Sequence, residues 1–496
     1  MFNLHITGKL LCIINDLYSY SKSAVAINQC TSKYFIVSEG VRQGGVLSGL
    51  LYTVFINELL IQLQTCNPKM GMGVENCCAP CLADDIACLA VSPSKLQDML
   101  DTCANYSNKW RFQFNASKSC IMVFSKNLHS IKFKWSVGNE CIPVADSYIH
   151  LGIELSSDLK SYKRTQTMCR KGRNSYFALS NIRDDNVYPS AMIRLYKSVV
   201  LPTCLYGCEM WCNLKSQDLN FLNQFQHFIV KNIQRLPKRT RSDMCESLLG
   251  LMPIISEIEK RKLLFLGKMC NFACEILPKK LFLQRLFTCL QSTEYRYGFI
   301  PDIINILQKY NLFDFLLKYI ESGLFPIKFA WKKIVINAVN SVQQELWNSR
   351  VTSDPDFIRF NQIHNTISTA NLWKYSNTAP ELRKAFLIAK FITNIPDQEV
   401  RNCALCDSPF TDIIMHASCE CRFTYHLRDT FFDLIIENFS LEIYVELSNY
   451  DCYTLYEALL GKKLSVNIDK LDCIQFRKLS YTHVVASAAE YNRLLH

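Results

Sequence analysis

Two adjacent aspartates lie in the middle of an apolar stretch of the sequence. Asp84 and Asp85 stand in the run CLADDIACLA, where two uncompensated carboxylates are energetically costly. A hairpin whose tight turn presents both side chains to a divalent cation would compensate their charge, because Mg²⁺ takes oxygen ligands. The alternative interpretation is a solvated turn between strands, since aspartate is common in turns.

A second group of residues, near the C-terminus, has the spacing of a zinc ligand set. The segment CALCDSPFTDIIMHASCEC follows the pattern C-x₂-C-x₉-H-x₄-C, formed by Cys403, Cys406, His416 and Cys421. Tetrahedral Zn²⁺ takes four nitrogen or sulfur ligands, two of them usually from a tight CxxC turn. Cys419 is the competing fourth ligand and His426 a more distant one, and a cysteine-rich loop without a metal is the alternative.

These candidate sites require elements that position them. Apolar residues follow helical spacing from Ser48, a candidate N-cap, and again after Ser92. Residues 119–124 and 148–155 have the β-branched or alternating apolar patterns of strands. The sequence therefore predicts an α+β fold for residues 1–155, in which helices pack on an antiparallel sheet.

Four sequence blocks occur in a fixed order around the aspartate pair: GVRQGGVLSGLL, then ADD, then FNASKS, then YIHLG. Together they resemble the reverse transcriptases of non-LTR, LINE-like retrotransposons, in which a GVRQG-x-LSPLLF block precedes YADD, FN-x-x-KS and YLG. The residues that match are Gly40, Val41, Arg42, Gln43, Gly44, Leu47, Ser48, Leu50, Ala83, Asp84, Asp85, Phe114, Asn115, Lys118, Ser119, Tyr148, Leu151 and Gly152.

The resemblance implies two-metal nucleotidyl transfer, an RNA-directed DNA polymerase reaction. Asp84 and Asp85 would hold the catalytic Mg²⁺ ions. Gln43 and Gly44 would line the pocket of the nascent base pair, where glycine lets the backbone approach a base and glutamine can donate and accept hydrogen bonds. Lys118 would meet the triphosphate as a point charge, although a solvated lysine before a strand is its alternative interpretation.

The same resemblance gives Tyr148 and Gly152 the role of holding the primer end near the metal ions. The alternative for these two residues is a strand with one exposed face. The sequence departs from the family pattern at two nearby positions, where Leu82 replaces the tyrosine before ADD and Gly49 replaces the proline after LS. Neither change removes a metal ligand.

A third departure concerns an essential aspartate. In the family it comes from a separate strand upstream of the GVRQG block, in an AFD-type motif. Asp16 is the only aspartate before Gly40 here, and it lies in a helical-looking segment that matches the family's connector. We therefore expect the chain to be the C-terminal remainder of a larger element protein, without the first palm motif, the fingers or an endonuclease domain.

After residue 155 the pattern becomes almost wholly helical. The block LYKSVVLPTCLYGCEMW, residues 195–211, resembles the LYKS-x-V-x-P-x-LLYG-x-E-x-W block of the family's thumb. Two basic clusters flank it: Lys160, Lys163, Arg164, Arg170, Lys171 and Arg173 form the first, and Lys231, Arg235, Lys238, Arg239 and Arg241 the second. Such clusters contact phosphates without reading sequence, although solvated helix faces are the alternative.

Composition limits the function classes. The 496 residues carry a net charge of +11, a mild preference for anionic partners such as an RNA template and a DNA primer. The 24 cysteines in a long chain without a signal-like start predict an intracellular protein, nuclear or cytoplasmic and not secreted, with reduced thiols. Because charged or polar residues interrupt every apolar run, we expect no membrane-spanning segment.

The expected organisation combines these inferences. We predict a partial reverse-transcriptase palm over residues 1–155, a helical thumb or connection over 156–295 and a helical region over 296–400. A zinc-knuckle-like segment over 401–430 and a helical tail over 431–496 would follow. Two functions fit this plan: an RNA-directed DNA polymerase that uses deoxynucleotides and Mg²⁺, truncated and inactive alone, or a non-catalytic remnant that binds nucleic acid. The sequence leaves enzymatic activity open.

Overall fold

A computed structural model describes residues 6–37, 40–67, 70–72, 75–124, 133–180, 188–291, 297–394 and 399–495. Contacts divide the chain into two compact units, which are treated separately below. The first comprises residues 1–159 with 274–288, and the second comprises 160–273 with 289–496. The boundary predicted near residue 295 lies outside the described residues, and the finer division of the helical part stays a prediction.

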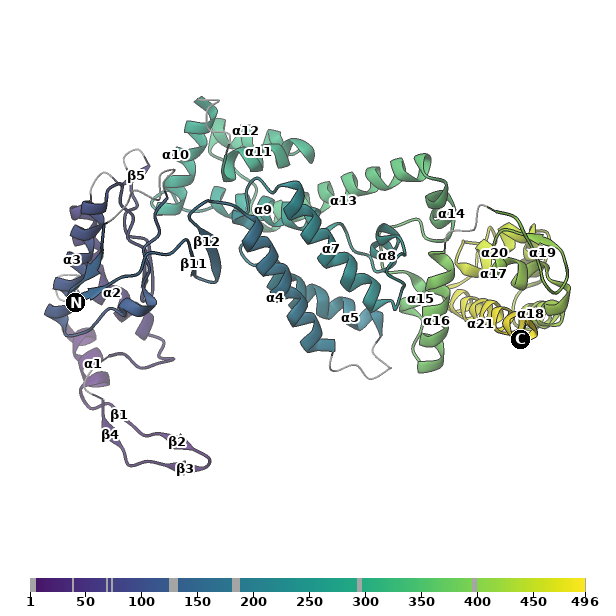
Figure 1. Ribbon diagram of the computed structural model, residues 1–496, viewed down its shortest axis with the longest axis horizontal. Helices are drawn as coiled ribbons and strands as arrows, with labels where there is room; N and C mark the ends of the chain where they lie inside the picture. The colour runs from purple at the N-terminus through teal and green to yellow at the C-terminus, as the bar shows by residue number, and fades with distance from the viewer. Residues whose placement is uncertain are drawn as a thin grey trace. The chain divides into compact units, whose positions relative to one another are not determined.

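The first unit combines helices with short strand pairs (Figure 1). Its helical elements are α1 (Gly8–Ser19), α2 (Ser48–Cys66), α3 (Pro93–Trp110), the 3₁₀ turn η2 (Ala116–Lys118) and most of α10 (Leu277–Gln291). Its strands are β1 (Lys22–Ser23), β2 (Ala26–Ile27), β3 (Cys30–Thr31), β4 (Phe35–Ile36), β5 (Gly71–Met72), β6 (Glu75–Asn76), β7 (Cys81–Leu82), β8 (Asp85–Ile86), β9 (Ser136–Val137), β10 (Glu140–Cys141), β11 (Ser147–His150) and β12 (Ile153–Ser156).

Helices α2 and α3 form the core of this unit. Leu59, Leu63 and Met99 are completely buried between them, and each such side chain stabilises the fold by about 1.5–3 kcal/mol. The Tyr106 hydroxyl donates to the Phe55 carbonyl oxygen at 2.6 Å and fixes one helix against the other. The two helices that the apolar spacing predicted are therefore present, and Leu59, Leu63 and Met99 belong to their shared core, whereas Leu50 is exposed.

The predicted starts of the two helices differ in outcome. Ser92 caps α3, because its side chain accepts a hydrogen bond from the Lys95 N–H and proline follows it in the first turn. The prediction that Ser48 caps α2 is wrong: Ser48 is the first helical residue, and its hydroxyl donates to the Arg42 carbonyl oxygen at 2.5 Å. A serine hydroxyl can donate a hydrogen bond as well as accept one, and here a backbone carbonyl oxygen in the preceding turn accepts it.

The strand predictions need two corrections. The segment 119–124 is not a strand among the described residues, since only Ile121 forms a bridge, to Val144. The segment 148–155 is a hairpin and not one strand, because Leu151 (φ 50°) and Gly152 (φ 79°) reverse the chain between β11 and β12. Instead of one antiparallel sheet, the described strands form separate two-stranded antiparallel ladders.

In the part of it that the structure describes, the second unit is helical apart from one strand pair. Its elements up to residue 270 are α4 (Tyr162–Ser180), α5 (Pro189–Leu195), the π-helical turn η4 (Tyr196–Val200), α6 (Leu201–Cys204), η5 (Cys208–Met210), α7 (Ser216–Ile233), α8 (Ser242–Leu248) and α9 (Ile254–Cys270). Those after residue 298 are α11 (Phe299–Lys309), α12 (Phe313–Ser322), α13 (Lys328–Ser353), α14 (Pro355–Ile363), α15 (Asn371–Lys374), α16 (Ala379–Ile392), β13 (Arg401–Asn402), β14 (Pro409–Phe410), α17 (Ile413–Met415), the π-helical turn η6 (His416–Glu420), η7 (Arg422–Thr424), α18 (Tyr425–Asn438), α19 (Leu441–Ser448), α20 (Cys452–Leu460) and α21 (Lys470–Leu495).

Two close helix pairs organise this unit. Helices α4 and α7 lie side by side (Figure 1), and a β-carbon on Gly172 would stand 2.7 Å from the Phe225 ring. Helices α9 and α13 meet where the Trp331 indole N–H donates to the Leu263 carbonyl oxygen at 2.7 Å, over Gly267. No described helix is both long and apolar enough to cross a membrane.

The α9–α13 contact predicts that alanine destabilises the protein at Gly267 but not at Gly49. In Gly267→Ala the new β-carbon would stand 2.7 Å from the Trp331 indole nitrogen, so we expect a loss of about 1–3 kcal/mol in the free energy of unfolding. Gly49→Ala in α2 is the matched control, because nothing lies within 4 Å of its β-carbon and alanine favours a helix. Urea unfolding followed by circular dichroism measures both, and equal stabilities would contradict the packing.

Candidate functional site

The aspartate pair lies at a hairpin turn, as the sequence predicted. Strands β7 and β8 are antiparallel, with Leu82 opposite Asp85, so that Ala83 and Asp84 form the turn. Ala83 has φ 52°, a left-handed conformation that costs a non-glycine residue about 1–2 kcal/mol. Both carboxylates are exposed to solvent. The backbone thus presents two adjacent negative charges at one exposed turn, as a hard cation requires.

The electrostatic field of these carboxylates reaches two neighbours that sequence reasoning missed. Burial raises the pKa of Tyr52, and the negative charges of Cys81 and Asp84 raise it further. Burial likewise raises the pKa of Cys81, with Asp84 and Asp85 adding to the effect. Tyr52 comes from α2, one turn after Ser48, so helical spacing from the GVRQGG block was the signal that could have found it.

The GVRQGG block is anchored on α1. The Arg42 guanidinium donates to the Leu17 carbonyl oxygen at 2.8 Å and to the Ser21 hydroxyl at 3.1 Å. Gly44 has φ 78°, which favours glycine, and both Gln43 and Gly44 are exposed. Arginine therefore fixes the base of this turn, while the two residues predicted to contact a nucleotide remain accessible.

Lys118 and Tyr148 come together through the backbone. The Tyr148 hydroxyl donates to the Lys118 carbonyl oxygen at 2.8 Å, and the Asn115 side chain accepts from the Lys118 N–H at 3.0 Å. The chain reverses four residues after Tyr148, at Gly152. Among the described residues, no hydrogen bond or ion pair joins this group to Asp84 or to Gln43.

The predicted zinc ligands converge on one point. The ligand atoms of Cys403, Cys406, His416 and Cys421 all lie within 4.8 Å of one another, and Cys406 Sγ is 3.2 Å from His416 Nε2. Three of the four side chains are buried. Cys419 is not part of the group: its carbonyl oxygen faces Cys452, and burial raises the pKa of its thiol. Of the two alternatives for the fourth position, the geometry selects Cys421.

Neighbouring side chains orient these candidate ligands. His416 Nδ1 lies 2.9 Å from a Glu420 carboxylate oxygen, which leaves Nε2 to face the cysteines. The Tyr491 hydroxyl lies 3.2 Å from Cys403 Sγ, and the Phe410 ring stacks on His416 at 5.4 Å. The soft, largely buried donor set of the kind that zinc prefers thus lies within residues 403–421, and Tyr491 joins it from a distant helix.

The local fold also changes thiol acidity. Burial opposes ionisation of Cys406, but hydrogen bonds from Ser408 outweigh it and lower the pKa of this thiol to about 7. Burial raises the pKa of Cys421 to about 11, and the hydrogen bond and charge of Cys406 act in the same direction. One thiol of the group is thus easily ionised without a metal, while a second needs a cation to hold its negative charge.

Comparison with known proteins places the first part of the chain in a family. Residues 1–155 match the protein family described as reverse transcriptase (RNA-dependent DNA polymerase). These residues form a reverse transcriptase domain. The predicted resemblance to the enzymes of LINE-like elements is confirmed for this reverse transcriptase domain, because mobile elements of that kind supply the relatives.

Three relatives show how far the similarity extends. The RNA-directed DNA polymerase from mobile element jockey of Drosophila funebris is 22% identical over 252 residues, which is 49% of this chain and 27% of that protein. The jockey protein of Drosophila melanogaster is 25% identical over 243 residues, or 47% and 26%. The Pol polyprotein from type-1 retrotransposable element R2 of Popillia japonica is 27% identical over 190 residues, or 35% and 24%. The chain spans about a quarter of the length of these relatives.

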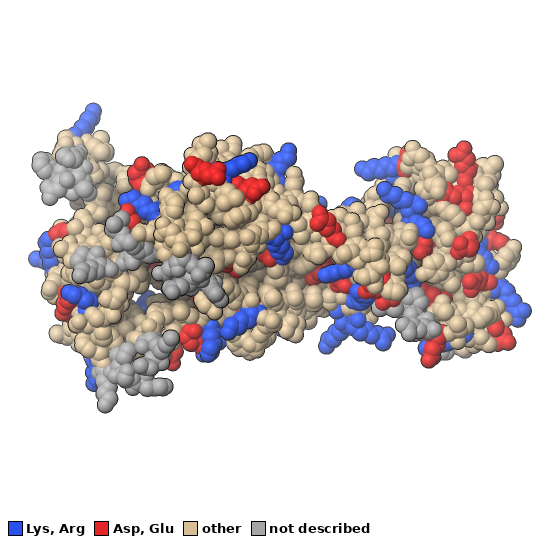
Figure 2. Space-filling model, turned by 90° about the horizontal axis from the view of Figure 1, so that it is seen from above, with Lys and Arg blue, Asp and Glu red and all other residues tan. Residues whose placement is uncertain are grey.

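Outside the reverse transcriptase domain, the two basic clusters are only partly free to meet phosphates. Lys163, Arg170 and Lys171 are exposed on α4, and the one acid of α4 and α7, Asp218, is buried. Arg241 differs, because it forms ion pairs with Asp243 and with two aspartates at the start of α14. Blue and red side chains are scattered among uncharged ones on the face drawn in Figure 2.

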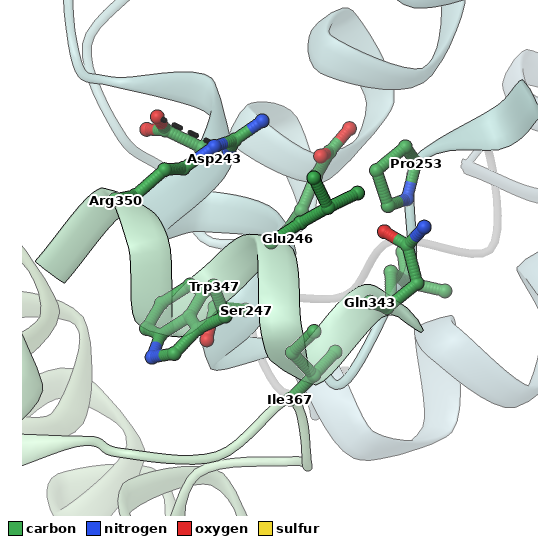
Figure 3. A pocket seen from close by; sticks show the side chains of 10 residues that line it. Asp243, Glu246, Ser247, Pro253, Gln343, Trp347, Arg350 and Ile367 are labelled. Carbon is green, nitrogen blue, oxygen red and sulfur yellow. Dashed lines mark ion pairs between the residues drawn. The ribbon is translucent and has the colours of Figure 1, made fainter. Parts of the chain in front are cut away.

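A surface hollow of about 370 Å³ lies beside this ion-pair network. Its lining residues are Asn223, His227, Arg241, Ser242, Asp243, Glu246, Pro253 and Arg350. An adjoining small pocket has Asp243 and Arg350 paired at its edge, 3.8 Å apart, with Glu246 and Trp347 nearby (Figure 3). The Glu246 carboxylate accepts a hydrogen bond from the Gln226 amide at 2.8 Å, so the acidic side chains here already have partners within the protein. The hollow is better explained by a structural network than by an active site.

A buried ion pair positions the element that carries His416. The Arg359 guanidinium of α14 donates to Asp412 Oδ2 at 2.9 Å, and the two side chains are only 8% and 4% exposed. The other oxygen of Asp412 accepts from the Ile414 and Met415 N–H groups and so caps α17. Arg359 therefore acts on the cysteine–histidine group through this cap.

This arrangement predicts a strong coupling between Arg359 and Asp412. In Arg359→Met the buried carboxylate would lose its partner, and we expect about 3–5 kcal/mol of destabilisation. Adding Asp412→Asn removes the uncompensated charge but keeps an oxygen for the cap, so we expect the double variant to recover about half of the loss. Chemical unfolding at one pH and metal concentration tests this, and additive effects of the two substitutions would contradict the pairing.

Proposed function

We propose that Asp84 and Asp85 bind Mg²⁺ in a reverse transcriptase that extends a DNA primer along an RNA template. The observation that carries this proposal is the β7–β8 hairpin, which presents two adjacent exposed carboxylates inside a domain that matches the family. In two-metal nucleotidyl transfer such carboxylates hold both ions in line with the attacking 3′ hydroxyl and the leaving pyrophosphate.

The neighbouring residues take supporting roles in this proposal. Gln43 and Gly44 contact the incoming deoxynucleotide or its template base, since both are exposed on a turn that Arg42 anchors. Lys118 meets the triphosphate, and Tyr148 and Gly152 hold the primer end. The hydrogen bond between the Tyr148 hydroxyl and the Lys118 backbone supports these last roles, because it links the nucleotide side of the site to the primer side.

Among the described residues, no further strand pairs with the acidic hairpin to bring a third carboxylate beside it. The resemblance calls for a third carboxylate on a neighbouring strand. Among the described residues β7 and β8 pair only with each other, and Asp16, the one aspartate before Gly40, lies on helix α1. We therefore propose that the 496-residue chain binds nucleic acid and does not polymerise on its own.

The remaining segments complete this assignment. We propose that residues 1–155 are a partial palm and that α4, α7 and their neighbours are a thumb. The thumb would contact the backbone of a primer–template duplex through the exposed lysines and arginines of α4 and of the loop after α7. The cysteine–histidine group would be a zinc knuckle, because its four ligand atoms lie close enough to share one tetrahedral ion.

The zinc proposal predicts a stoichiometry. We expect metal analysis of the purified chain to find about one zinc, bound by Cys403, Cys406, His416 and Cys421. The pair Cys403→Ser with Cys406→Ser should lose it. Cys421→Ser should lose it as well, whereas Cys419→Ala is the matched control and should keep it, since Cys419 lies outside the ligand group. Protein purified without chelator that contains no zinc would count against the site.

The catalytic proposal predicts the behaviour of the chain in a primer-extension assay. With a primed RNA template, Mg²⁺ and deoxynucleotides, we expect binding that weakens steeply with salt, because bound lysines and arginines displace counterions. We expect no extension, because the attacking hydroxyl and the triphosphate would not be held in line without the third carboxylate. Extension that disappears in Asp84→Asn would overturn the second half of this account and make the chain an active polymerase.

A further inference from the structure

Three large apolar side chains stand in solvent within six residues of the second unit. Leu324, Ile327 and Phe329 are 76%, 70% and 79% exposed, in the link between α12 and α13 and the first turn of α13. With the exposed Lys328, Lys332 and Lys333 they form a surface that we call the basic–apolar corner. Large apolar side chains exposed side by side commonly mark a binding surface.

The corner is held rigidly from behind. Phe325 packs on the Trp331 ring at 4.7 Å and on the Tyr319 ring at 5.8 Å. The Pro326 carbonyl oxygen accepts from the Asn271 amide at 3.0 Å. Because these neighbours anchor the intervening residues, Leu324, Ile327 and Phe329 point outward from an ordered backbone. Binding of a ligand would therefore cost little conformational entropy of the backbone.

The charge of the corner calls for an anion. Lys328 and Lys332 lie one turn apart at the positive end of α13, where like charges and the helix dipole both disfavour lysine. No acid occupies the first turn of this helix, and none of the corner's three lysines forms an ion pair with a described carboxylate. Between residues 315 and 335 Glu321 is the only acid in the sequence. A bound polyanion would relieve this repulsion.

We propose that the basic–apolar corner binds single-stranded nucleic acid. The lysines would contact phosphates, and Phe329 would stack on an unpaired base, with Leu324 and Ile327 beside it. A duplex cannot offer a base face to this ring, because its bases are stacked on one another. An anionic membrane fits less well, since α13 beyond Lys333 exposes asparagine, serine and glutamate and no apolar stripe. The proposal does not depend on Asp84, Asp85 or zinc.

Fluorescence anisotropy with a labelled oligouridylate tests the surface on the full chain. Phe329→Ala should weaken binding about fivefold or more. Lys332→Gln with Lys333→Gln should lower the slope of log Kd against log salt by about 1.4. The matched control is the double variant Lys470→Gln with Leu471→Ala. This lysine and leucine are also exposed, in the first turn of α21, but aspartates flank them in the sequence. The control should bind RNA as tightly as the unmodified chain does. All five substituted side chains are exposed, so unchanged melting curves should accompany the variants.

Two further measurements separate this surface from others that bind polyanions. Binding of a hybrid duplex should not change in Phe329→Ala, whereas an equal loss for duplex and single strand would overturn the proposal. Photo-crosslinking of thiouridine-labelled RNA should mark the tryptic peptide that begins at Phe329. Unchanged oligouridylate affinity in Phe329→Ala would also overturn it, as would loss of binding to phosphatidylserine vesicles without loss of RNA binding.

Discussion

The repulsion between two neighbouring carboxylates is the constraint on which the reverse transcriptase domain depends. Two such charges are tolerated only where water or a cation compensates them, so the chain must bring Asp84 and Asp85 to an exposed turn. This turn requires Ala83 to adopt a left-handed backbone conformation, which its β-carbon disfavours. A local cost of this kind persists when the surrounding packing fixes the backbone.

That packing comes from the two helices on which the hairpin rests. Cys78, just before β7, is completely buried with Leu59 and Leu63 of α2, and its carbonyl oxygen accepts from the Leu89 N–H at 2.7 Å beyond β8. The hairpin is therefore anchored at the end away from its turn, while the charged turn stays in solvent. On α2, burial raises the pKa of Tyr52, and the negative charge of Asp84 adds to this rise.

Local chemistry explains which features could be predicted from the sequence. The acidic hairpin, the start of α3 at Ser92 and the selection of three cysteines with His416 all follow from short-range spacing. The hairpin at Gly152 could have been recognised from its glycine, but the alternation on either side of it resembled one strand. The prediction of a single continuous sheet was wrong because pairing between distant strands leaves no signal in one sequence.

The contacts that position the cysteine–histidine group were beyond sequence reasoning for the same cause. Tyr491 and Arg359 reach it from helices that are separated from Cys403 by 88 and 44 residues along the chain. Their burial is informative only once the fold is known, because an isolated tyrosine or arginine on a helix carries no ligand signal. The ligand spacing could be predicted, but the second layer of side chains that orients it could not.

Titration of Mn²⁺, followed by the electron paramagnetic resonance signal of the free ion, tests the role of the acidic hairpin most directly. Zinc-saturated chain keeps the cysteine–histidine group out of the measurement. We expect the chain to withdraw Mn²⁺ from solution at the hairpin and the double variant Asp84→Asn with Asp85→Asn to lose this binding, with its melting temperature unchanged. Equal Mn²⁺ binding by the two proteins would show that the paired carboxylates are not a metal site.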